Sequence, residues 1–148
     1  MMLSSISFQG SSPSPPMEES ELATSGVLTS LNFPERYFNG LHIIRKIQVP
    51  EGNTIRIRFT DFDCEREYDT VTITDGRDGS RLGLFDGMAN SDDNWRTKEI
   101  VSNTDMVEVL FHTDGSGSQM GWRLEWGKHK DLITFFMSFT EFNRNSWR

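Results

Sequence analysis

Five carboxylates alternate along one short stretch of the chain and could bind a divalent cation. They lie within nine residues, at Asp61, Asp63, Glu65, Glu67 and Asp69. Ca²⁺ is a hard ion that takes about six to eight oxygen ligands from carboxylates, backbone carbonyls and water. A loop so rich in carboxylates suits this chemistry if a second loop approaches it. Taken by itself, the stretch favours the simpler interpretation of a solvated acidic loop.

Other kinds of chemistry find little support in the sequence. Asp61-x-Asp63-x-Glu65 resembles the start of an EF-hand loop, but Arg66 takes the sixth position, where that loop needs glycine. The histidines, at positions 42, 112 and 129, have neither the spacing of helical metal ligands nor a nucleophile motif beside them. We therefore predict that this chain is not an enzyme.

Composition bounds the class of protein. The chain has 148 residues and a net charge of −7. Nucleic-acid binding needs a basic face, so we expect no nucleic-acid partner. No apolar run reaches the roughly 18 residues of a membrane span, and no signal peptide is visible. The single cysteine, Cys64, excludes an intrachain disulfide, and neighbouring carboxylates favour an unreactive thiol.

Short segments with period-two hydrophobicity predict strands. Apolar side chains alternate with charged ones over 54–60 and 122–126, the period recurs over 71–73 and 107–112, and a weaker copy lies at 43–49. Asp-Gly turns separate these segments, and no segment has a sustained helical period. We predict an all-β fold, an antiparallel two-sheet β-sandwich. Trp122 and Trp126 are expected in its core, and a carbohydrate-stacking face is the alternative.

The organisation along the chain is a central domain with two flanking segments. Residues 1–25 are rich in serine and proline and are predicted to be a flexible N-terminal segment. Residues 26–127 carry the strand pattern. Residues 128–148 form a tail with apolar pieces, for which an edge strand and a partner-binding segment are both open interpretations.

The order of several landmarks resembles the CUB domain family over residues 26–127. The landmarks are Gly26–Ser30, Asn32-Phe33-Pro34, Tyr37, Phe62, Glu65, Tyr68-Asp69, Asp75-Gly76, Asp86-Gly87, Asp114, Ser116 and Gly121-Trp122. The resemblance implies a jelly-roll-like sandwich of about ten short strands. The chain departs from the family pattern in its cysteines: Ile43 and Asp86 occupy positions where cysteines are usual, and the cysteine usual just before Tyr68-Asp69 is absent.

The resemblance also implies a Ca²⁺ site. Carboxylates matching Glu65, Asp69 and Asp114 are ligands in the calcium-binding members of the family. Backbone oxygens matching Ser116 and Gly117 complete the protein ligands. A tyrosine matching Tyr37 supports the site through hydrogen bonds, without contacting the ion.

The family also suggests the setting and the partner. Its members usually occur in extracellular proteins, including complement-type proteases and endocytic receptors, where they mediate protein–protein contacts. We therefore expect an extracellular, non-catalytic protein-interaction module whose binding loops are ordered by one Ca²⁺, with a partner's lysine approaching Glu65 or Asp114. The alternative is a module that binds carbohydrate or a lipid surface without a functional Ca²⁺ site.

Overall fold

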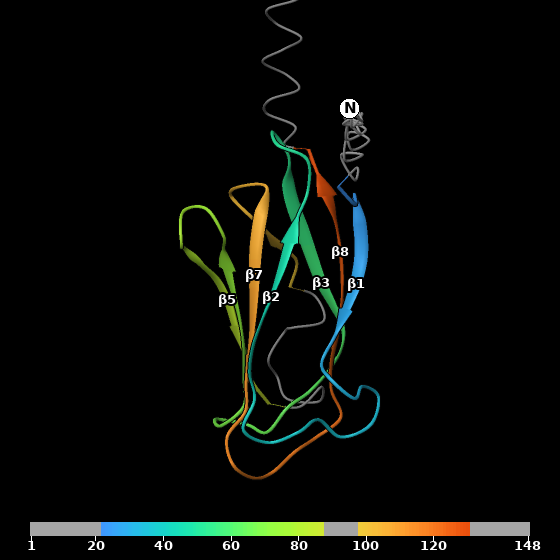
Figure 1. The fold of residues 1–148 in the computed structure, drawn as a ribbon, viewed down its shortest axis with the longest axis vertical. Helices are drawn as coiled ribbons and strands as arrows, with labels where there is room; N and C mark the ends of the chain where they lie inside the picture. The colour runs from blue at the N-terminus through green and yellow to red at the C-terminus, as the bar shows by residue number, and fades with distance from the viewer. Residues whose placement is uncertain (1–21, 88–97, 131–148) are drawn as a thin grey trace, which may run out of the picture.

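The computed structural model describes residues 22–87 and 98–130, which form two antiparallel four-stranded sheets (Figure 1). The first sheet has the order β1 (Ser25–Thr29), β8 (Gly121–His129), β3 (Thr54–Asp63), β6 (Ile100–Val101). The second has the order β2 (His42–Gln48), β7 (Met106–His112), β4 (Thr70–Asp75), β5 (Arg81–Phe85). The predicted all-β antiparallel sandwich is confirmed, with eight strands in the described residues.

The inward side chains of both sheets form one core. On β3, Ile55, Ile57 and Phe59 are buried while the two arginines between them are exposed, as the period-two pattern predicts. An aromatic cluster fills the middle, with ring centroids of Phe59 at 5.1 Å from Phe62, 5.0 Å from Phe85 and 6.2 Å from Trp122.

The two tryptophans of β8 occupy different places. Trp122 is buried in the core, as predicted. Trp126 is half-buried and packs against the core from its margin, facing Gly26 of the neighbouring strand β1. A side chain at position 26 would collide with the indole ring, so the glycine leaves room for it.

Strand pairing brings three loops to one end of the sandwich. Asp63, the last residue of β3, pairs with Gly121, the first residue of β8. His112, the last residue of β7, pairs with the first residues of β2 and β4. The loops that follow β1, β3 and β7 therefore lie together at the lower end of Figure 1.

The ends of the domain can be followed on both sides. Strand β1 begins at Ser25 and β8 continues to His129, where Thr54 of β3 pairs with it. Residues 1–21 and 131–148, which hold most of the two predicted flanking segments, lie outside the described residues. Within the described part, no helix is long and apolar enough to cross a membrane.

Candidate metal centre

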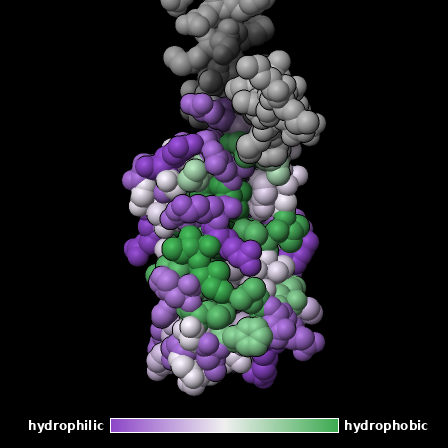
Figure 2. All heavy atoms as spheres, in the orientation of Figure 1, coloured by the Kyte–Doolittle hydropathy of each residue, from purple (hydrophilic) through white to green (hydrophobic). Residues whose placement is uncertain are grey.

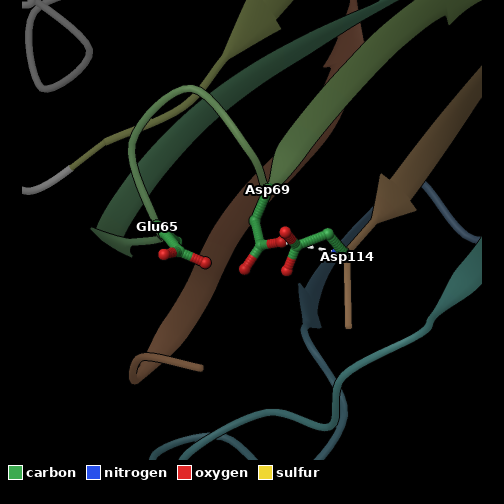
Figure 3. A group of neighbouring side chains, drawn as sticks. All are labelled: Glu65, Asp69 and Asp114. Carbon is green, nitrogen blue, oxygen red and sulfur yellow. Dashed lines mark hydrogen bonds between the residues drawn. The ribbon is translucent and has the colours of Figure 1, made fainter. Parts of the chain in front are cut away.

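Three carboxylates from two of these loops converge. Glu65 follows β3, Asp69 directly precedes β4, and Asp114 follows β7. One oxygen from each lies within 4.8 Å of the others (Figure 3). The structure thus divides the acidic stretch: Glu65 and Asp69 point toward Asp114, whereas Glu67 is exposed outside this group.

The short loop from Glu65 to Asp69 contains a sharp backbone turn. Glu67 adopts a left-handed conformation with φ of 70°. The Asp69 N–H donates to the Glu65 carbonyl at 3.1 Å and closes the turn. This turn places the Glu65 and Asp69 side chains on the same side, toward the loop after β7 (Figure 3).

Asp69 is the centre of the hydrogen-bond network. Its side chain is fully buried. Its Oδ1 accepts from the Asp114 N–H at 2.8 Å, and its Oδ2 accepts from the Tyr37 hydroxyl at 2.5 Å. The carboxylate therefore links the loop after β7 and the β1–β2 loop to the start of β4.

Tyr37 lies beside the acids and is hydrogen-bonded to both Asp69 and Glu65. Its hydroxyl also accepts from the Glu65 N–H at 3.0 Å, so one oxygen contacts both acidic residues. The ring is buried and packs edge-on against Phe111 with centroids 5.2 Å apart. Burial and the hydrogen bond to Asp69 raise the pKa of Tyr37, so the hydroxyl remains a proton donor.

Glu65 has a carboxylate oxygen that is suited to a cation. Its Oε2 is buried, and no donor among the described residues reaches it. Desolvation, followed by the negative charges of Asp114 and Asp69, raises the pKa of Glu65. A buried acceptor without a donor, beside two further carboxylates, is the environment that a bound cation would neutralise. The donor set consists of hard oxygens, which fits Ca²⁺.

The turn after β7 fits closely around Glu65. The Ser116 N–H donates to Asp114 Oδ1 at 3.0 Å and shapes the turn. Gly117 has φ of 78°, and a Cβ there would collide with the Glu65 carboxylate. Ser116 and Gly117 are thus beside the acids, while coordination through their carbonyl oxygens stays a prediction.

Asp86 contributes to this region in a way that the sequence analysis missed. Its Oδ2 accepts from the Glu67 N–H at 2.9 Å, and the next residue, Gly87, accepts from the Cys64 N–H at 2.8 Å. By the family resemblance Asp86 occupies a position where a cysteine is usual, and in this chain its carboxylate is hydrogen-bonded to the loop after β3. The signal was present as an Asp-Gly turn, but a turn alone does not indicate what it contacts.

Cys64 sits directly behind the acids and is inaccessible. The side chain is fully buried. Burial, together with the charges of Asp69, Asp63 and Asp86, raises the pKa of the Cys64 thiol. Since the thiolate is the reactive form, this agrees with the predicted unreactive thiol.

Comparison with known proteins identifies the fold. The family model described as "CUB domain" matches residues 18–126. The chain belongs to the CUB domain family. The suspected resemblance is confirmed. The match covers the described strands from β1 to β7 and residues 121–126 of β8.

The relatives of this CUB domain are much longer proteins. The chain is 33% identical to human cubilin over 110 residues, which cover 72% of this chain and 3% of cubilin. It is 32% identical to the mouse complement C1r-B subcomponent over 116 residues, covering 72% of this chain and 15% of that protein. The chain therefore spans only a small part of the curated relatives that it matches.

A solved structure provides a comparison at the level of one domain. The crystal structure of the MASP-1 CUB2 domain bound to Ca²⁺ has a TM-score of 0.61 and 26% sequence identity with this chain. The similar region covers 72% of this chain and 94% of that domain.

Proposed function

We propose that this CUB domain is a non-catalytic protein-interaction module whose binding loops are ordered by one Ca²⁺. The observation that carries the proposal is the buried Glu65 Oε2, which lacks a donor and lies within 4.8 Å of carboxylate oxygens of Asp69 and Asp114. The Ca²⁺ bound by the similar MASP-1 CUB2 domain supports the choice of ion.

The ligands would come from both loops. Carboxylates of Glu65, Asp69 and Asp114 would bind the ion, and the carbonyl oxygens of Ser116 and Gly117 would add backbone ligands. Ca²⁺ would supply the positive charge that these acids lack, and would tie the loop after β3 to the loop after β7. Tyr37 would keep Asp69 oriented through its hydroxyl.

The stabilisation follows from the affinity of such sites. Extracellular Ca²⁺ modules have Kd values of about 10⁻⁴–10⁻³ M. At roughly millimolar Ca²⁺, linkage gives about 0.5–1.5 kcal/mol of added stability, or a few degrees in Tm for a domain of this size. The relatives cubilin, C1r and mannan-binding lectin serine protease 1 support an extracellular setting, where Ca²⁺ reaches these concentrations.

Thermal unfolding with excess chelator and with roughly millimolar Ca²⁺ tests the site. Glu65→Gln keeps the side-chain shape but removes one charged ligand, so we expect the Ca²⁺-dependent rise in Tm to disappear. Glu67→Gln, an exposed acid two residues away, serves as the matched control and should retain the rise. A rise of equal size in both variants would show that the ion binds elsewhere.

The partner would be a protein that presents a lysine to the acidic loops. A cation can approach Glu65 or Asp114 at the rim of the site, where both side chains are partly exposed. Binding of the partner should then require Ca²⁺ and decrease on Glu65→Ala or Asp114→Ala. Unchanged partner binding by both variants would rule out this mode.

A second candidate function has one observation in its favour. Two aromatic side chains beside the site are well exposed, Phe38 at 56% and Tyr68 at 58%. Exposed aromatic rings can stack on sugars or enter a lipid interface. If a glycan or lipid surface is the ligand, Tyr68→Ala should weaken binding to a glycan array or to vesicles in the presence of chelator, whereas Glu65→Gln should not.

A further inference from the structure

The two outer faces of the sandwich differ in chemistry. The outer face of the first sheet carries ion pairs, with Arg56 to Glu99 at 3.0 Å, Arg58 to Glu125 at 3.5 Å and Arg123 to Glu125 at 3.1 Å. Such charged side chains are well solvated and need no cover. This contrast draws attention to the outer face of the second sheet.

A mainly apolar row, with Thr72 as its polar member, crosses all four strands of that second sheet. Ile44 of β2 pairs with Leu110 of β7, which pairs with Thr72 of β4, which in turn pairs with Leu84 of β5. Ile44 is 50% exposed and Leu84 is 53% exposed. Figure 2 shows apolar surface gathered in the middle of the visible face, where Figure 1 places β2 and β7 in front. We call these four residues the apolar row.

Polar side chains border the apolar row on both sides. Toward one end of the sandwich lies the ion pair between Lys46 and Glu108, at 3.0 Å. Toward the other end lie His42 and His112, with ring centroids 5.9 Å apart. An exposed apolar patch with a polar rim is typical of an interaction surface. The row is narrow and straight, which suits an extended segment.

The chain itself contains a segment with the matching pattern. Residues 131–148 continue directly from the described part and are rich in apolar side chains from Leu132 to Phe139. Every second residue from 133 to 139 is apolar, namely Ile133, Phe135, Met137 and Phe139, and the positions between them hold Thr134, Phe136 and Ser138. When extended, this segment has one wholly apolar face and one face of mixed polarity.

The end of β8 places this segment within reach of the apolar row. His129 pairs with Thr54 at the start of β3, at the same end of the sandwich as Gln48, where β2 ends. From Gln48 to Ile44 is about 13 Å along the strand, and the two sheets are about 10 Å apart. The 18 residues of 131–148 span about 60 Å when extended.

We propose that residues 131–148 fold back across the outer face of the second sheet and cover the apolar row with the face that carries Phe135 and Met137. Tethering favours this occupant over a second copy of the chain, because a short linker gives an effective concentration of the order of millimolar. The inference concerns the outer face of the second sheet and does not depend on the Ca²⁺ site.

Paramagnetic relaxation in the full chain tests the contact. A nitroxide is attached through Ser138→Cys, on the mixed face of the segment opposite Phe135 and Met137, where the label does not enter the contact. The buried Cys64 stays unlabelled. We expect loss of amide signals around Ile44 and Leu110, and intact signals on the outer face of β1 and β8. Intact signals around Ile44 and Leu110 would overturn the proposal.

Two exposed substitutions make the test specific. Ile44→Glu places a charge in the apolar row and should restore the lost signals. Val27→Glu is the matched control, since Val27 is 49% exposed on the outer face of the other sheet, and it should change nothing. Signal loss on unlabelled chains mixed with labelled ones would assign the row to a second copy. Loss confined to the exposed edge of β2 or β5 would indicate strand addition. Either result would overturn the proposal.

Discussion

Asp69 shows how one buried carboxylate can serve two purposes. A fully buried charge is costly unless donors or a cation compensate for it. Its two oxygens already accept from the Tyr37 hydroxyl and the Asp114 N–H. The second of these bonds fixes the loop that carries another acid of the cluster. The residue that would bind the ion therefore also organises the loops around it.

The hydroxyl of Tyr37 allows a direct test of that organisation. Tyr37→Phe keeps the ring against Phe111 but removes the donor to Asp69 and the acceptor for the Glu65 N–H. Leaving buried polar groups without partners costs about 1–3 kcal/mol, so we expect the free energy of unfolding to fall by that amount. Urea unfolding in chelator measures this, and a variant as stable as the wild type would contradict it.

At the scale of elements, the loop after β3 depends on a contact with the end of β5. Asp86→Ala removes the acceptor for the Glu67 N–H and frees the turn between Glu65 and Asp69. We expect weaker Ca²⁺ binding, by roughly the factor of ten that corresponds to one hydrogen bond. Calorimetric titration checks this. Asp86→Asn keeps an acceptor oxygen and should bind Ca²⁺ nearly as well as the wild type. An equal loss of Ca²⁺ affinity in both variants would assign the effect to the charge of Asp86 instead of its hydrogen bond.

A second network fixes the opposite end of the sandwich. Asp75, the last residue of β4, is buried and accepts from the Thr104 hydroxyl at 2.7 Å and from the N–H groups of Asn103 and Thr104 at 2.9 Å each. Burial by itself raises the pKa of Asp75, but these hydrogen bonds outweigh it and the pKa is lowered. Close by, hydrogen bonds from Arg77 lower the pKa of Asp105.

The lowered pKa of Asp75 predicts an acid-dependent stability. A carboxyl whose folded pKa is below its unfolded value, about 3.9, stabilises the fold fully above that value and loses its contribution as pH falls through the folded pKa. Asp75→Asn should cost about 1–3 kcal/mol at neutral pH. The difference in unfolding free energy between wild type and variant should shrink below about pH 4. A difference that is constant down to pH 3 would contradict this linkage.

The elements differ in how far the sequence predicts them. Strand β3 was predictable because one of its faces is buried in the core and the other is exposed, which imposes a strict period of two. Strand β2 is an edge strand, so Arg45 stays exposed in an inward position and blurs the pattern. The two-residue β6 is too short to show any period. Glu65, Asp69 and Asp114 could be grouped only through the family resemblance, because their proximity arises from pairing across the sheet.

At the scale of the whole molecule, the core has to replace covalent cross-links. The chain has one cysteine and thus no intrachain disulfide. Each bridge typical of the family would add about 2–5 kcal/mol. Here the sheets are joined by edge-to-face aromatic contacts. The ring centroids of Phe59 in the first sheet and Phe85 in the second are 5.0 Å apart. Contacts of this kind add about 0.5–1.5 kcal/mol beyond burial.

Stability should therefore depend on the aromatic cluster and not on redox conditions. Phe59→Ala removes the ring that contacts Phe62, Phe85 and Trp122, and should cost about 3–5 kcal/mol. Val27→Ala, at an exposed strand position, should stay within about 0.5 kcal/mol of the wild type. Urea unfolding with and without reductant should give the same midpoint for each protein. A midpoint that falls in reductant would mean that Cys64 forms an intermolecular bridge that contributes to the measured stability.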